Sequence, residues 1–231
     1  MILDYKNVKD FLGETLYSLI IFKNLPLPIQ ADAIRVALLK KYGGIWMDVD
    51  TIITNGKFLE ELKNYETVML GDEKYKAQNI GFIFASKNSS IINQWLLEII
   101  NKLKIYRQIN LNQNKKRKKL KVKWNYLGNE IIDRISKNIT SKKFFRLDRN
   151  KMNAFPENKR YENSSLSNFE KYQKLFFQKG EPHSILNNVK GIILLHNSWT
   201  PFEYKVMSQK EFLASDILLS HLLVEILKNS S

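Results

Sequence analysis

The chain has 231 residues, of which 44% are hydrophobic and 12% aromatic, so it can bury a sizeable core and is not an intrinsically disordered protein. It contains no cysteine, which excludes disulfides, thiolate zinc sites and cysteine nucleophiles and indicates a reducing compartment. Its formal net charge of +14 favours polyanionic partners, but the abundance of lysine, asparagine and isoleucine indicates AT-rich coding, so charge alone does not diagnose a function.

The first part of the chain is predicted to be helical. Apolar residues recur at helical spacing over residues 5–22, and the prolines in 25–28 should force an extended turn. A second helix is expected over 30–42, where Gly43 and Gly44 stop it.

The rest of the chain alternates between predicted strands and helices, which indicates an α/β fold. A basic loop is expected at 112–123, and residues 141–184 carry only weak signals. The expected strands are 45–53, 67–73, 79–86 and 189–199, and the expected helices are 89–109, capped by Ser89 or Ser90, 129–139 and 208–228.

Two carboxylates stand one residue apart in the strand predicted over 45–53. Because side chains alternate between the two faces of a strand, Asp48 and Asp50 should share a face with Trp46, while the other face packs against the core. Acids this close repel one another unless a positive charge lies between them. A hard divalent cation with open positions for phosphate oxygens meets that need, and an indole suits a flat ring such as a nucleobase or the face of a sugar.

One helix earlier, Asp32 and Arg35 are three residues apart and should share a helical face. Such a pair can hydrogen-bond the hydroxyls of a sugar. Taken alone it is also typical of a surface ion pair that contributes little to stability, and a lone D-x-D is often structural. The occurrence of both features within about twenty residues is what points to a site.

The combination resembles the sugar-binding region of Asp-X-Asp glycosyltransferases. This group includes capsular polysaccharide synthesis proteins, yeast-type mannosyl- and galactosyltransferases and the glucosylating clostridial toxins. A second segment, "ILLHNSWT" at 193–200, is similar to the closing H/N-x-S-W segment of the same group. The matching positions of the first segment are Ala31, Asp32, Arg35, Tyr42, Gly43, Gly44, Trp46, Asp48 and Asp50.

The resemblance implies a GT-A-like, Rossmann-like fold and transfer of a sugar from a UDP- or GDP-sugar donor with retention at the anomeric carbon. Asp48 and Asp50 would be the catalytic residues and would hold Mn²⁺ or Mg²⁺, which neutralises charge on the departing diphosphate. The other implied roles are donor-sugar binding by Asp32 and Arg35, a donor contact by Trp46, completion of the metal shell by His196 or Asn197, phosphate contacts by Ser198 and Trp199, and an acceptor-side contact by Asn79.

The resemblance also bears on domain organisation. The group has an opening strand and helix before the Asp-x-x-Arg helix, and only thirty residues precede Ala31 here. We therefore expect a single glycosyltransferase-like domain over 1–231 with added helices, an atypical or truncated N-terminus at 1–30, and a variable acceptor-side insert at 112–184.

The expected setting is surface polysaccharide assembly, capsular or lipopolysaccharide. No signal peptide is recognised and the apolar stretches are too short to span a bilayer, so we expect a cytoplasmic protein, peripheral on the inner face of the cell membrane. The basic run 115–123 could dock on anionic lipid beside a glycan or lipid-linked acceptor, form a nucleic-acid-binding patch, or be a solvated loop. Trp124 and Tyr126 could form an acceptor-binding rim, but we expect them in the core. His183 and His221 are expected to be surface or packing residues rather than ligands.

Two other functions are compatible with the residues. The first is a truncated, non-catalytic remnant that binds a nucleotide sugar without turnover. The second is a basic nucleic-acid-binding protein, which is disfavoured because lysine and arginine cluster mainly in one loop and no nucleic-acid-binding motif is present.

Overall fold

The computed structural model describes residues 7–21, 25–75, 77–113, 122–137, 139 and 143–229. Backbone contacts divide the chain into two compact units. Unit 1 comprises Met1–Met47 and Leu62–Leu147, and unit 2 comprises Asp48–Glu61 and Asp148–Ser231. Residues 115–121 of the predicted membrane-docking run lie outside the described part of the chain, so that expectation stays a prediction.

Unit 1 is built on a four-stranded sheet with the strand order β1-β4-β3-β5. The strands are β1 (Gly44–Met47), β3 (Thr67–Asp72), β4 (Ala77–Ala85) and β5 (Phe144–Asp148). β4 pairs antiparallel with both β1 and β3. The strands expected at 67–73 and 79–86 are thereby confirmed, and the fold is mixed α/β.

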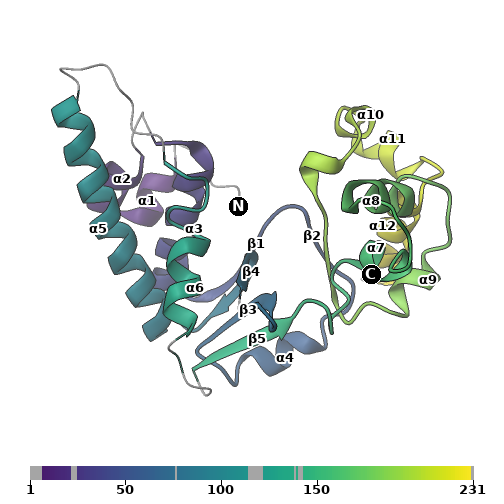
Figure 1. Ribbon diagram of the computed structural model, residues 1–231, viewed down its shortest axis with the longest axis horizontal. Helices are drawn as coiled ribbons and strands as arrows, with labels where there is room; N and C mark the ends of the chain where they lie inside the picture. Colours follow the sequence, from purple (N-terminus) through teal and green to yellow (C-terminus); the bar gives the residue numbers. More distant parts are fainter. Residues whose placement is uncertain are drawn as a thin grey trace. The chain divides into compact units, whose positions relative to one another are not determined.

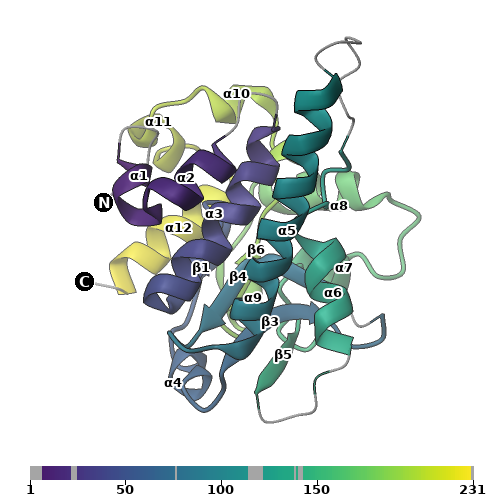
Figure 2. The same ribbon diagram turned by 90° about the vertical axis from the view of Figure 1, so that its left-hand side faces the viewer.

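Helices cover one face of this sheet (Figures 1 and 2). α3 and α6 both contact the long helix α5, and α6 also contacts β4. The helices of this layer are α1 (Val8–Leu12), α2 (Glu14–Ile20), α3 (Leu27–Tyr42), α5 (Ser90–Gln113) and α6 (Asn129–Lys137). A further helix, α4 (Phe58–Leu62), belongs to unit 2 except for its last residue.

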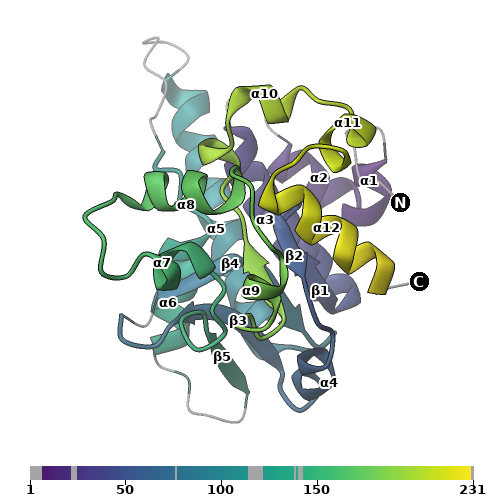
Figure 3. The same cartoon turned by 90° about the vertical axis from the view of Figure 1, so that its right-hand side faces the viewer.

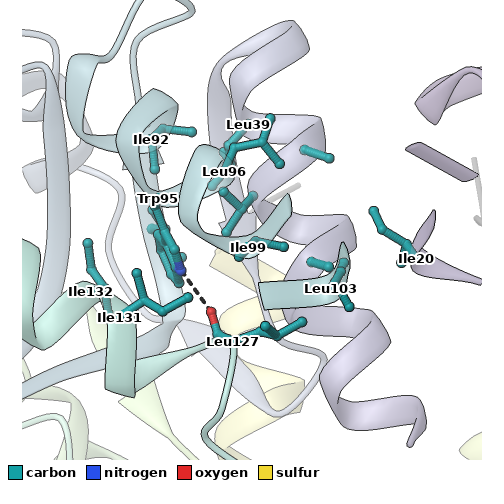
Figure 4. Close-up of a cluster of buried hydrophobic side chains, with 14 of the residues drawn as sticks. Ile20, Leu39, Ile92, Trp95, Leu96, Ile99, Leu103, Leu127, Ile131 and Ile132 are labelled. Carbon is teal, nitrogen blue, oxygen red and sulfur yellow. Dashed lines mark hydrogen bonds between the residues drawn. The ribbon is translucent and has the colours of Figure 1, made fainter. Parts of the chain in front are cut away.

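The core of unit 1 lies between these helices and the sheet, and Trp95 of α5 is its largest fully buried side chain. Figure 4 shows the indole among apolar side chains of α3, α5 and α6, with its Nε1–H donating a hydrogen bond of 2.8 Å to the carbonyl of Leu127. Ser89 caps α5 as expected, because its hydroxyl accepts from the backbone N–H of Ile92 at 3.1 Å.

Two glycines decide where the first helices end. The single helix predicted over 5–22 is wrong, because Gly13, with φ +79°, separates α1 from α2. Gly43, with φ +68°, ends α3 and passes so close to β4 that an added Cβ would lie 2.7 Å from the backbone nitrogen of Lys87. α3 begins earlier than expected, at Leu27, because the first turn of a helix tolerates a proline such as Pro28.

The strand predicted over 45–53 is wrong. The chain forms β1, then a turn closed by a hydrogen bond of 3.0 Å from the N–H of Thr51 to the carbonyl of Asp48, and then β2 (Thr51–Ile53) in a different sheet. Asp48 and Asp50 therefore do not continue the strand face of Trp46. Val49 should lie on the strand face that packs against the core, but it is fully exposed. It lies in the turn between the two strands and not within either of them.

Unit 2 is mainly helical and contains a two-stranded antiparallel ladder of β2 and β6 (Ile192–Leu194) (Figure 3). Its core gathers residues of α8, β6 and α12, including Tyr172, Phe176, Ile193 and Leu222. The helical elements are α7 (Pro156–Arg160), α8 (Asn168–Phe176), α9 (His183–Leu186), the 3-10 turn η1 (Asn197–Trp199), α10 (Phe202–Lys205), α11 (Gln209–Leu213) and α12 (Leu218–Asn229).

Other sequence predictions are corrected here. The region 141–184, where the sequence carries only weak signals, contains β5, α7 and α8 in its described part. α8 begins with a capping box, in which the side chains of Ser167 and Glu170 each accept a hydrogen bond from the other residue's backbone N–H. The helix predicted over 208–228 is interrupted between α11 and α12. Trp124 is 74% exposed rather than in the core, whereas Tyr126 packs against the core of unit 1 as expected. Within the described residues, none of the helices has the length and apolar character needed to cross a membrane.

We expect Trp95→Phe to lower the free energy of unfolding by about 1–3 kcal/mol, because the carbonyl of Leu127 loses its buried donor. Urea unfolding followed by circular dichroism measures this. Trp124→Phe is the matched control and should change the free energy of unfolding by less than about 0.5 kcal/mol, since that indole is exposed. Equal losses in the two variants would contradict the role given to Trp95.

Candidate functional site

The β2–β6 ladder brings the paired acids beside the closing H-N-S-W segment. Thr51 is opposite Leu194, and one residue further the backbone N–H of Leu195 donates to the carbonyl of Asp50 at 2.8 Å. His196 follows directly. Two segments that are far apart in sequence are thus joined by main-chain hydrogen bonds within unit 2.

The two acids occupy the turn between β1 and β2, where their side chains are partly exposed. Asp50 is close enough to His196 to act on its ionisation: burial lowers the pKa of His196, and the negative charge of Asp50 offsets part of that shift. The imidazole is therefore biased towards its neutral form, the form that binds metals.

Aromatic rings surround the His196 imidazole. Phe155 stacks on it with the ring centroids 5.3 Å apart, and Trp199 lies 3.9 Å away by the same measure. Tyr172 meets its edge at 5.5 Å. Asn197 and Ser198, by contrast, are exposed. The segment thus presents an amide and a hydroxyl to solvent while its imidazole and indole are held in a packed cluster.

Helix α8 holds this segment in place, and sequence reasoning missed it. The Tyr172 hydroxyl accepts a hydrogen bond of 3.3 Å from the backbone N–H of His196 and lies 3.3 Å from the Thr200 hydroxyl. Gln173 donates from Nε2 to the carbonyl of Trp199 at 3.2 Å. The Ser-x-x-Glu capping box at residue 167 was the signal that could have located the helix.

A buried carboxyl lies near this cluster. Glu157 of α7 is 1% exposed, and neither of its side-chain oxygens has a hydrogen-bond partner among the other described residues. Burial raises its pKa to about 7, an effect that only its own backbone N–H offsets. Burial likewise raises the pKa of Tyr172, on which both Glu157 and Asp50 act through their charges.

Unit 1 contains the other predicted residues, centred on Arg35. Asp32 and Arg35 are each only 6% exposed, and Arg35 Nη2 lies 3.6 Å from Asp32 Oδ1. Arg35 also donates from Nη1 to the carbonyl of Ile80, and its guanidinium lies 5.1 Å from the ring centroid of Trp46. The pair is not the solvated surface ion pair considered above, since it is buried.

The carbonyl that Arg35 binds belongs to an irregularity in β4. The β3–β4 register shifts between Met69 and Leu70, so that Leu70 faces Asn79 whereas Met69 faces Ile83. Asn79, expected at an acceptor cleft, uses its side-chain oxygen to accept from the N–H of Gly81 at 2.8 Å. In the structure, therefore, both Arg35 and Asn79 support this β-bulge.

The side chains of the candidate site provide only part of the ligand set that a hard cation needs. Asp48 and Asp50 offer carboxylate oxygens and Asn197 an amide oxygen, which are ligand types that Mg²⁺ and Mn²⁺ accept. Within the described residues, however, no group of three or more His, Cys, Asp or Glu side chains is gathered closely enough to hold a metal ion. The residues fit a cation that takes further ligands from a bound phosphate.

The predicted site residues therefore fall into two groups. Unit 2 contains Asp48, Asp50, His196, Asn197, Ser198 and Trp199, whose segments the ladder joins. Unit 1 contains Asp32, Arg35, Trp46 and Asn79, whose contacts converge on the region of β4 around Ile80. The roles assigned to the individual residues stay predictions.

These features define a mixed α/β protein with paired acids on a turn and an Asp–Arg pair on the preceding helix. In comparison with known families, residues 1–109 match the model of the family described as capsular polysaccharide synthesis protein. The match includes every predicted site residue of unit 1 together with Asp48 and Asp50, and it supports a role in capsular polysaccharide synthesis. Neither the curated proteins nor the solved structures contain a significant match to the chain.

We expect Glu157→Gln to change the pH dependence of stability. The wild-type carboxyl keeps its proton up to about pH 7 in the folded state but loses it near pH 4.5 when the chain is unfolded. Its contribution to stability is therefore fully present below pH 4.5 and is lost as the pH rises through 7. The difference between the two pKa values corresponds to a loss of up to about 3 kcal/mol of stability. The variant should therefore gain in stability relative to wild type between pH 5 and pH 8.

Urea unfolding at several pH values measures this gain. The exposed Glu203 provides the control, because Glu203→Gln should leave the difference from wild type within about 0.5 kcal/mol throughout. A stability difference for Glu157→Gln that does not vary with pH would show that this carboxyl is not held protonated by burial.

Proposed function

We propose that this protein is a metal-dependent, retaining glycosyltransferase of surface polysaccharide synthesis. Its donor would be a UDP- or GDP-sugar, and its acceptor a glycan or a lipid-linked glycan. The observation that carries the proposal is the β2–β6 ladder, which places Asp50 beside His196 in unit 2. The family match over residues 1–109 supports the biosynthetic setting.

The residues of unit 2 would bind the diphosphate end of the donor. Asp48 and Asp50 would hold Mn²⁺ or Mg²⁺, with Asn197 or the neutral imidazole of His196 as a further ligand. When bound, the ion supplies Lewis-acid neutralisation of the charge that develops on the leaving diphosphate. Ser198 and Trp199 would contact that phosphate, the exposed hydroxyl of Ser198 as a hydrogen-bond donor.

The residues of unit 1 would bind the sugar. Asp32 would accept hydrogen bonds from sugar hydroxyls, and Arg35 would donate to them. Trp46 would offer a ring face, and Asn79 an amide on the acceptor side. Because Arg35 also supports the β-bulge, Arg35→Lys should lower both activity and stability.

We expect the wild-type protein with Mn²⁺ to release free sugar from at least one nucleotide sugar in a panel. Asp50→Asn should lower that rate by at least about a hundredfold, because even residues behind a metal ligand change activity by about 10–100-fold. Chromatographic measurement of the released sugar tests this. Asp216→Asn, an acid of unit 2 outside the ladder, is the matched control and should retain the wild-type rate.

If no donor is hydrolysed, a donor-binding measurement separates the remaining functions. Binding of a nucleotide sugar without turnover would favour the non-catalytic remnant. Absence of both binding and turnover across the panel would contradict the transferase proposal.

Titration calorimetry tests the metal separately. We expect Mn²⁺ to bind weakly to the protein alone and about tenfold or more tightly with saturating UDP or GDP, because the described side chains supply an incomplete set of ligands. Asp50→Asn should abolish the nucleotide-dependent gain, while Asp216→Asn should retain it. Failure of both Mn²⁺ and Mg²⁺ to bind wild type with nucleotide present would contradict metal dependence.

A further inference from the structure

Two adjoining hollows flank α7 in unit 2, with volumes of about 310 Å³ and 270 Å³. Asn153 and Lys159 line both of them, so the two hollows are neighbours, and together we call them the α7 groove. Its other polar lining residues include Arg149, Asn150, Asn158, Arg160 and Asn188.

The lining of the α7 groove is rich in amides and cations. Asparagine amides offer both donors and acceptors, which matches the paired hydroxyls of a sugar ring. Three cationic side chains contribute to the two hollows, whereas Glu162 is the one acidic residue among the lining residues described. Guanidinium and ammonium groups bind carboxylate and phosphate through charge-assisted hydrogen bonds.

The α7 groove is tied to the candidate site through β6. The segment that carries Asn153 is hydrogen-bonded to that strand, since the N–H of Leu194 donates to the carbonyl of Ala154 at 2.9 Å. Just before the strand, the N–H of Lys190 donates to the carbonyl of Met152 at 3.0 Å. Phe155 lines the groove and stacks on His196 with the centroids 5.3 Å apart. One aromatic ring therefore separates the groove from the imidazole beside Asp50.

Backbone and side-chain hydrogen bonds fix the position of Asn153, which lines both hollows of the α7 groove. It adopts φ +51°, a left-handed conformation that asparagine tolerates better than most residues, and it is 6% exposed. Its backbone N–H donates to the carbonyl of Asn150 at 3.1 Å, and its side-chain Nδ2 donates to that of Asn188 at 3.4 Å. The amide is thus held between the two hollows.

We propose that the α7 groove is the acceptor subsite and binds a glycan whose sugars carry an anionic group, a carboxylate or a phosphate. This inference rests on the proposed transferase function. Two neighbouring hollows suit consecutive sugar units better than a single ring, and the excess of cations selects acidic sugars. The ring of Phe155 lies between these units and the site of transfer.

Calorimetry at physiological salt tests the proposal with a tetrasaccharide of alternating glucuronate and N-acetylglucosamine. The neutral comparison is the same tetrasaccharide after carboxyl reduction, and N-acetylglucosamine 6-phosphate tests phosphate as the anion. We expect an acidic probe to bind and the reduced tetrasaccharide to bind at least about tenfold more weakly, the loss that corresponds to one charge-assisted hydrogen bond. Equal binding of the acidic and reduced forms, or no binding by either acidic probe, would overturn the proposal.

Two variants locate the binding in the α7 groove. Lys159→Gln removes an exposed cation and should weaken binding of the acidic probe about tenfold. Asn153→Asp keeps the shape of the side chain but adds a negative charge, and should weaken the acidic probe more than the reduced one. Lys174→Gln makes the same charge change at an exposed lysine outside both hollows and should leave binding unchanged. Equal weakening by Lys174→Gln and Lys159→Gln would mean non-specific attraction to a basic protein and would overturn the proposal.

Binding of the acidic sugar and hydrolysis of the donor test two different proposals, and either one can fail without the other. Donor hydrolysis needs no acceptor, so it is measured on the wild-type protein without the acidic probe. If hydrolysis occurs but no acidic sugar binds, the acceptor proposal alone is wrong. If the acidic sugar binds and no donor is hydrolysed, the transferase proposal is wrong, and with it the assignment of the groove as an acceptor subsite.

Discussion

The arrangement of the candidate site in unit 2 depends on one short antiparallel ladder. β2 and β6 contribute three residues each, and the hydrogen bond from Leu195 to Asp50 extends their pairing to the acid itself. The same strand β6 is hydrogen-bonded on another side to the segment before α7. Through these main-chain contacts the paired acids, the His196 cluster and the α7 groove belong to one hydrogen-bonded framework.

Both units contain buried ionisable side chains, and the two units differ in the partners that they give to these side chains. In unit 1, the guanidinium of Arg35 is compensated by Asp32, by a backbone carbonyl and by the ring of Trp46. In unit 2, Glu157 is buried with no such partner among the residues that the structure describes, and burial raises its pKa to about 7. An uncompensated carboxyl costs stability at neutral pH, and proteins retain such strain most often near functional sites.

Local chemistry explains most of what sequence reasoning predicted correctly. The strands at β3 and β4, the helices α3, α5 and α6, and the Ser89 cap all follow from periodicity, glycine stops and capping residues. The errors also have local causes. The helical spacing over 5–22 continues through Gly13, and the apolar run around Asp48 has the pattern of one strand although the chain changes sheets there. The Ser-x-x-Glu pattern of the capping box before α8 is present in the sequence and is the local signal for that helix.

The sequence by itself determined which residue types are available: an Asp–Arg pair at helical spacing, two acids one residue apart, and a distant His-Asn-Ser-Trp segment. Tertiary structure decided which of them meet. Only strand pairing joins Asp50 to the residues before His196, and only the packing of α3 against the sheet turns Asp32 and Arg35 into a buried pair. The physical reason is that periodicity reports the face on which a residue lies, whereas partners distant in sequence are chosen by burial and by backbone hydrogen bonds that no local pattern encodes.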